Sequence, residues 1–109
     1  MATAYKVLGQ IAPLATTATA LYTVPSATEA VVSSISVCER GGAAATFRIM
    51  VRPDGAALSN QHYLVYDAAL DANDTIILTI GITMDATDVL EVYASSADLS
   101  FHAYGSEIS

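Results

Sequence analysis

The stretch Ala72–Ser95, ANDTIILTIGITMDATDVLEVYAS, alternates between apolar and polar residues over most of its length. Within it, Thr75–Ile80 and Val89–Ser95 each set a row of aliphatic side chains against an opposite row of mixed character. Alternation of β-branched and aromatic residues with a period of two is typical of strands. The two runs, joined by the loop Gly81–Asp88, predict a hairpin of two scaffold strands with a mechanical role.

The same period recurs along the chain and predicts an all-β protein of about eight strands. Turn residues separate the runs, and Arg52–Gly55, RPDG, fits a type I turn with proline second. Strand starts follow one another at a spacing typical of an antiparallel β-sandwich or jelly roll. The other expected strands are Ala4–Gln10, Ala20–Pro25, Val31–Arg40, Thr46–Arg52, His62–Asp67 and Leu99–Gly105.

The length of 109 residues predicts one domain, 1–109. Residues 1–19 are expected to form an N-terminal strand and extended arm, and residues 20–109 the sandwich core. Because extended termini readily add to exposed sheet edges, we expect Ala2–Leu14 to tie one subunit to the next. The inward residues expected in the core are Val31, Ile35, Val37, Phe47, Ile49, Val51, Ile76, Leu78, Leu90 and Val92.

Charge is scarce: 53% of residues are hydrophobic and 14% are charged, against a typical charged share of about 25%. The net charge is −7 with four Lys and Arg residues, which disfavours binding to nucleic acid or anionic membranes. The N-terminus lacks a secretion signal, and no apolar run is long enough to span a membrane. So few charges favour a protein whose surface is covered by partner proteins.

Several strands carry apolar residues on both faces, which suits a sheet buried on both sides. With no helices expected to supply the cover, the pattern predicts an oligomer. The residues expected at the interface are Tyr5, Val7, Ile77, Val89 and Tyr93.

The sequence contains no arrangement of reactive residues typical of catalysis, which predicts that the protein is not an enzyme and holds no cofactor or metal. A G-x-S-x-G nucleophile turn is absent, and His62 and His102 lie within strand patterns. Asp71–Asp74, Asp85 and Asp88 form an acidic cluster in the sequence, but their spacing lacks the calcium-loop pattern and favours turn chemistry.

Two residue types leave alternatives open. Cys38 is the single cysteine, which indicates folding in a reducing cytosol. Its side chain is expected either to pack as a small buried hydrophobe or to form an intermolecular disulfide. The six tyrosines fit ordinary strand packing, a subunit interface or a carbohydrate-binding surface, in that order.

Five segments, in this order, resemble a group of small virion proteins of tailed bacteriophages, including cyanophages. They are Leu21–Pro25, Val31–Cys38, His62–Asp67, Ala72–Met84 and Val92–Phe101, and together they span most of the chain. Glu39 departs from the pattern, which has Asn after the Val-Cys pair. The resemblance implies a structural role in the virion and supplies no catalytic residues.

The sequence and the resemblance together favour a capsid decoration or cement protein that stabilises the head. A structural module of the tail, neck, baseplate or fibre is the alternative, and a carbohydrate-binding receptor module is the third hypothesis. Analogy with small β-rich virion proteins favours a homotrimer. The expected partners are other copies, the major capsid protein or tail proteins, and a host-surface glycan, in a virion assembled in the host cytoplasm.

Overall fold

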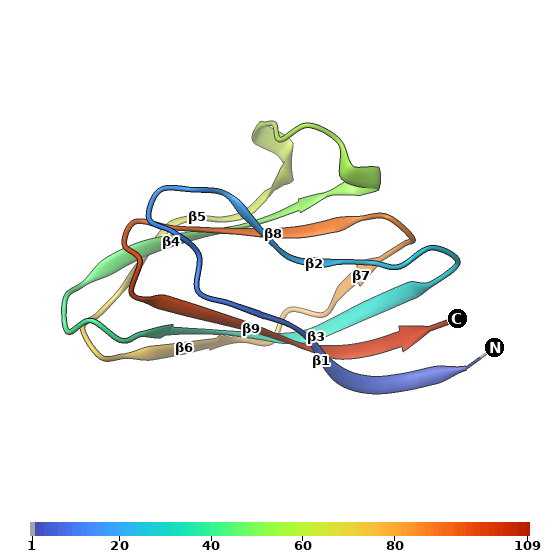
Figure 1. Ribbon diagram of the computed structural model, residues 1–109, viewed down its shortest axis with the longest axis horizontal. Helices are drawn as coiled ribbons and strands as arrows, with labels where there is room; N and C mark the ends of the chain where they lie inside the picture. Colours follow the sequence, from blue (N-terminus) through green and yellow to red (C-terminus); the bar gives the residue numbers. More distant parts are fainter. Residues whose placement is uncertain (1) are drawn as a thin grey trace.

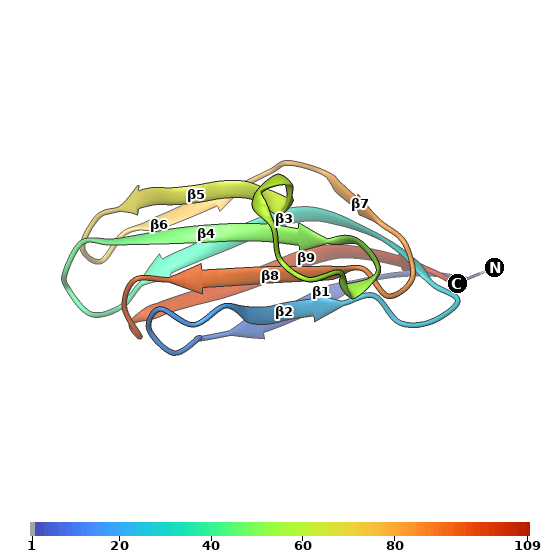
Figure 2. The same cartoon turned by 90° about the horizontal axis from the view of Figure 1, so that it is seen from above.

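The computed structural model describes residues 2–109 as two antiparallel sheets packed face to face (Figure 1). The first sheet has the order β1-β9-β3-β6, and β7 also pairs with β3; the second has the order β2-β8-β4-β5 (Figure 2). The predicted all-β sandwich is confirmed. The strands are β1 (Thr3–Ile11), β2 (Thr19–Thr23), β3 (Glu29–Glu39), β4 (Ala45–Arg52), β5 (Tyr63–Leu70), β6 (Thr75–Leu78), β7 (Ile82–Met84), β8 (Val89–Ala94) and β9 (Leu99–Ile108).

Most successive strands lie in opposite sheets, and the two strand orders are those of a jelly roll with one edge strand divided into β6 and β7. This topology corrects the predicted hairpin in Ala72–Ser95. β6 and β7 both pair with β3, whereas β8 pairs with β2 and β4 in the other sheet. The hairpin prediction was wrong because alternation reports which face is buried and says nothing of the pairing partner.

The core lies between the sheets and is centred on Ile35, Val37, Phe47, Ile49 and Phe101, each at most 1% exposed. Val51, Ile76 and Leu78 are partly buried against it, as predicted. Val31 is a correction, because its side chain faces outward. A bulge at Ser33 shifts the register of β3, so that Ala30 and Val32 point inward at that end of the strand. Further core residues at most 1% exposed are Val24, Leu70, Leu90, Val92, Ala94, Leu99 and Ala103.

The N-terminal segment is an edge strand of its own sandwich. β1 pairs with β9 over its whole length, from Thr3 opposite Ile108 to Ile11 opposite Phe101. The backbones of Ala2 and Ser109 exchange two hydrogen bonds of 2.7 and 2.9 Å. Ala2 and Ser109, the two ends of the described range, therefore lie side by side (Figure 1). Transfer of this segment to a neighbouring subunit stays a prediction, and it would require β1 to leave β9.

The segment Pro53–His62, which we call the cover loop, folds over the outer face of the second sheet (Figure 1). Its short 3-10 turns, η1 (Pro53–Gly55) and η2 (Asn60–His62), pack against β8 and β4. Beneath it, Met50 is 1% exposed although β4 turns it outward. The chain therefore supplies part of the cover that we had assigned to another subunit.

The cover loop begins with a turn that differs from the predicted type I. Asp54 and Gly55 both have left-handed backbone, with φ of 54° and 65°, and the Ala56 amide donates to the Pro53 carbonyl. Asp tolerates this conformation better than most residues. Here Asp54 is also held in place, since its amide donates to Asp88 Oδ1 at 2.8 Å and its carboxylate accepts from the Thr87 hydroxyl at 2.6 Å.

Candidate interaction surfaces

The outer face of the first sheet is almost free of charge. The register of the described strands shows which residues point outward from this sheet, and Glu29 is the one charged residue among them. The other outward residues are Thr3, Tyr5, Val7, Gln10, Val31, Ser34, Ser36, Cys38, Thr75, Ile77, Thr83, Ser100, His102, Tyr104, Ser106 and Ile108.

Large apolar and aromatic groups on this face are open to solvent. Tyr5 is 86% exposed, Ile77 66%, Val7 47% and Tyr104 37%. A shallow groove of about 500 Å³ runs across β1, β9 and β3, and its lining includes Tyr5, Lys6, Val7, Val31, Ser33 and Tyr104. A face with few charges, protruding rings and a groove is suited to burial against another protein.

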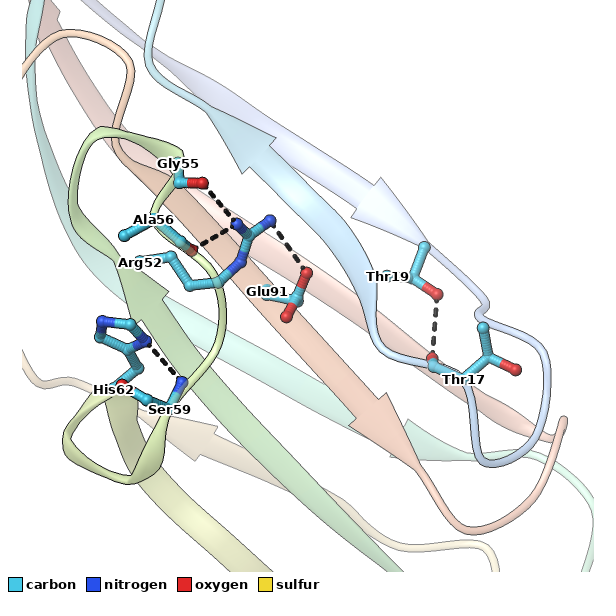
Figure 3. Close-up of polar contacts among 8 residues, drawn as sticks. All are labelled: Thr17, Thr19, Arg52, Gly55, Ala56, Ser59, His62 and Glu91. Atoms are coloured by element: carbon cyan, nitrogen blue, oxygen red, sulfur yellow. Dashed lines mark hydrogen bonds and ion pairs between the residues drawn. The ribbon is translucent and has the colours of Figure 1, made fainter.

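His102 sits near the middle of the same face. Its Nδ1 lies 3.2 Å from Gln10 Nε2 and 3.1 Å from the Tyr104 hydroxyl. These contacts hold side chains of β1 and β9 together, so His102 serves packing within the face. Cys38 is half-buried in β3 on this side. His62, by contrast, is buried in the cover loop, where its Nδ1 accepts from the Ser59 amide at 3.0 Å (Figure 3).

The outer face of the second sheet has a different chemistry. Arg48 on β4 lies between two tyrosine rings, with its guanidinium carbon 4.2 Å from the centroids of Tyr66 on β5 and Tyr93 on β8. Its Nε donates to Asp67 Oδ1 at 2.7 Å and its Nη2 to Asp67 Oδ2 at 3.3 Å. The bond to Asp67 is the main cause that raises the pKa of Arg48 above its usual value. We call these four residues, with Tyr63, the tyrosine–arginine cluster.

The five residues expected at one interface are divided between opposite faces of the sandwich. Tyr5, Val7 and Ile77 lie on the outer face of the first sheet, whereas Val89 and Tyr93 belong to the second. Val89 is only 7% exposed because β8 lies under the cover loop, so it offers little surface to a second subunit. Tyr93 packs on Arg48. An interface formed by these residues stays a prediction, and only the first three can share a face.

The acidic cluster expected from the sequence is divided as well. Asp71–Asp74 belongs to the turn between β5 and β6, and Asp85 and Asp88 to the loop after β7, at the opposite end of the sandwich (Figure 1). Within residues 2–109, no group of three His, Cys, Asp or Glu side chains is placed to hold a metal ion. The only helical segments in that range are short 3-10 turns, and neither resembles a membrane-spanning helix.

Glu39 has a structural role that the sequence pattern did not reveal, and its side chain is 2% exposed at the end of β3. Its carboxylate accepts from the backbone amides of Gly41 and Gly42 at 2.8 Å each and of Asn73 at 3.0 Å. These bonds lower the pKa of Glu39, and the bond from the Asn73 amide has the largest effect. The residue that departs from the phage pattern thus joins two loops at one end of the sandwich.

Comparisons with known proteins show a likeness of fold. No family model matches the chain, and no curated protein matches it. Among solved structures, the chain is similar to one in the structure of infectious bursal disease virus, Gx strain, at 14% identity and a TM-score of 0.52, over 97% of this chain and 30% of that one. Two structures of a pentameric capsid protein isolated from metagenomic phage sequences match at 16% identity over 94% of this chain, with TM-scores of 0.37 and 0.28, and over 59% and 66% of theirs. The chain thus spans less than a third of the viral protein that shares its fold.

Proposed function

We propose that this protein is a virion structural protein that decorates or cements a capsid through the outer face of its first sheet. The observation that carries the proposal is the near absence of charge from that face among the described residues, although the chain has 11 acidic and four basic residues. Desolvation of charges opposes burial, so a face without them can be covered at little cost.

The same face offers apolar surface that burial would remove from water. Full burial of a large apolar side chain contributes about 1.5–3 kcal/mol relative to full exposure. Tyr5 at 86% and Ile77 at 66% exposure would each gain a large part of that amount. They lie on the two edges of the sheet, on β1 and β6, so a partner that touches both spans its whole width.

The fold supports the proposal by analogy. Jelly rolls recur in viral capsid proteins, and one solved chain of this fold belongs to a virus structure. Fold alone does not determine function, so the surface chemistry carries the argument. The sequence resemblance to tailed-phage virion proteins points in the same direction.

Light scattering of the purified protein, over a range of concentrations, tests association. We expect a mass above the 11.3 kDa of one chain, and three times that value for the predicted homotrimer. Val7→Asp places a charge in the groove of the proposed interface and should reduce the mass to that of a monomer. Leu14→Asp is the matched control, because Leu14 is 73% exposed in the connection between β1 and β2, outside the sheets.

Location on the particle tests the function itself. A decoration protein should be recovered with purified heads in hundreds of copies, whereas a tail, neck or fibre part should be present in far fewer. Densitometry of purified particles distinguishes the two. A protein that stays monomeric at high concentration and binds neither heads nor tails would refute a structural role in the virion.

A further inference from the structure

The tyrosine–arginine cluster lies on the face opposite the proposed assembly surface and has no part in it. It is built from three adjacent strands: Tyr66 and Asp67 on β5, Arg48 on β4 and Tyr93 on β8. Arg48 and Tyr93 are directly paired across the strands. Tyr63 adds a second ring on β5, perpendicular to Tyr66 at an interplanar angle of 82° and a centroid distance of 5.0 Å.

An irregularity in β5 brings two functional groups to one place. Phe47 of β4 pairs with Ala68 of β5, and Ile49 pairs with Val65, so β5 has one extra residue between these two pairs. Both Tyr66 and Asp67 therefore lie opposite Arg48. Asp67 has left-handed backbone with φ of 50°. Bulges and unfavourable backbone conformations of this kind are enriched at binding and active sites. Regular pairing would place one of these two side chains on the other side of the sheet.

The cluster is accessible although its members are held firmly. Tyr66 is 61% exposed, and the side chains of Asp67 and Arg48 are 42% and 21% exposed. Contacts from both rings and the carboxylate fix the guanidinium, so it would lose little freedom on binding a ligand.

Hydrogen-bonding capacity remains at the surface of the cluster. Arg48 uses Nε and Nη2 on Asp67, and its Nη1 makes no hydrogen bond within the described residues. Each Asp67 oxygen accepts one bond from Arg48 and keeps a second acceptor position. The ring of Tyr66, with Arg48 over one face but still 61% exposed, therefore stands next to one donor pair and one acceptor pair. The net charge of the chain, −7, repels anions.

We propose that the tyrosine–arginine cluster binds a neutral pyranose sugar of a glycan, which stacks on Tyr66 while neighbouring hydroxyl groups bond to Arg48 and Asp67. A pyranose presents an apolar C–H face and pairs of adjacent hydroxyls that both donate and accept. Aromatic rings bind the first. A fixed arginine–aspartate pair matches the second, with Arg48 Nη1 donating to one hydroxyl oxygen and Asp67 accepting from the next hydroxyl.

The test is an NMR titration of the ¹⁵N-labelled full chain with the methyl glycosides of glucose, galactose and mannose. We expect saturable shifts at the Arg48 side chain and at the backbone amides of Tyr66 and Asp67. Tyr66→Ala should weaken binding about two- to twelvefold, which is the factor that a ring contact of about 0.5–1.5 kcal/mol gives at 1.4 kcal/mol per factor of ten. Tyr66→Phe keeps the ring and should bind nearly as well as the original chain.

Tyr5→Ala is the matched control, because Tyr5 is the most exposed tyrosine and lies on the first sheet. It should leave sugar binding unchanged. Titration with sialic acid distinguishes an acidic ligand from a neutral one. The proposal is overturned by an absence of saturable shifts with all three neutral glycosides, by binding of sialic acid alone, or by loss of binding in Tyr5→Ala rather than Tyr66→Ala. These outcomes do not depend on whether the protein assembles on a capsid.

Discussion

Arg52 should be the residue on which the cover loop depends. Its Nη1 donates to the carbonyls of Gly55 and Ala56 at 3.0 and 2.8 Å, and its Nη2 donates to Glu91 Oε2 at 3.1 Å (Figure 3). The side chains of Arg52 and Glu91 are 19% and 9% exposed, so the ion pair is largely shielded from water. Arg52→Ala would remove three hydrogen bonds and leave Glu91 charged and unpaired beside β4.

The magnitude follows from that burial. Removing one partner of a fully buried ion pair costs about 3–5 kcal/mol, and a hydrogen bond to a charged group contributes about 1.5–3 kcal/mol. Because Arg52 keeps some contact with solvent, we expect Arg52→Ala to lower the free energy of unfolding by about 2–4 kcal/mol. For a domain of this size that corresponds to a decrease in Tm of roughly 10–20 °C.

Urea unfolding followed by circular dichroism, at one protein concentration, measures the loss. Hydrogen exchange at the Ala56 and His62 amides reports the cover loop itself, since both amides bond within it. Arg40→Ala is the control: its exposed side chain bonds one carbonyl, that of Ala97, so the change should cost less than about 1 kcal/mol.

A double variant separates the ion pair from the packing beneath it. Replacing Arg52 and Glu91 together by Met removes both charges and should recover most of the stability lost in Arg52→Ala, because Arg52 Nε already lacks a partner within the described part of the chain. If Arg52→Ala costs no more than Arg40→Ala and exchange in the loop is unchanged, the loop does not depend on this residue.

Three further substitutions address other parts of the sandwich. The pKa of Glu39 is lowered in the folded state, so its contribution to stability is present above pH 4.5 and is lost as pH falls through the lowered value; the urea midpoints of the original chain and Glu39→Gln should therefore converge in acid. Burial, and then the 2.6 Å bond to Glu107, raise the pKa of Tyr22. Tyr22→Phe should cost about 1 kcal/mol at pH 7 and should reduce the loss of stability above pH 10, measured by thermal unfolding. A Cβ on Gly105 would collide with the Val31 backbone, so Gly105→Ala should cost about 1–3 kcal/mol in urea unfolding, whereas Ser106→Ala should be nearly neutral.

Alternation along the chain was enough to predict the fold class and most strand positions. It predicted the inward faces of β4, β6 and β8, because a strand that packs on a core must place its apolar residues at every second position. It did not predict that β6 and β8 lie in different sheets. Pairing in a jelly roll joins strands far apart in sequence, and local periodicity carries no information about that choice.

Bulges account for the errors at single residues. Val31 and Ser33 fit an inward row together with Ile35, and the extra residue at Ser33 reverses the face only at one end of β3. The tyrosine–arginine cluster was missed for the same reason. Arg48 and Asp67 are 19 residues apart, and their contact depends on a shift in pairing between β4 and β5 that no short pattern reveals.

The two outer faces together constrain how the protein would sit on a particle. The charge-poor face of the first sheet and the tyrosine–arginine cluster lie on opposite sides of the sandwich, so a subunit that buries the first must turn the second away from that contact. The second sheet is also closed in part by its own cover loop, which removes Met50 from any contact. An assembly through the first sheet would therefore leave the sugar site open to the surroundings. The effects of the two variants should then be separable: Val7→Asp should abolish association and keep sugar binding, whereas Tyr66→Ala should keep association and weaken sugar binding.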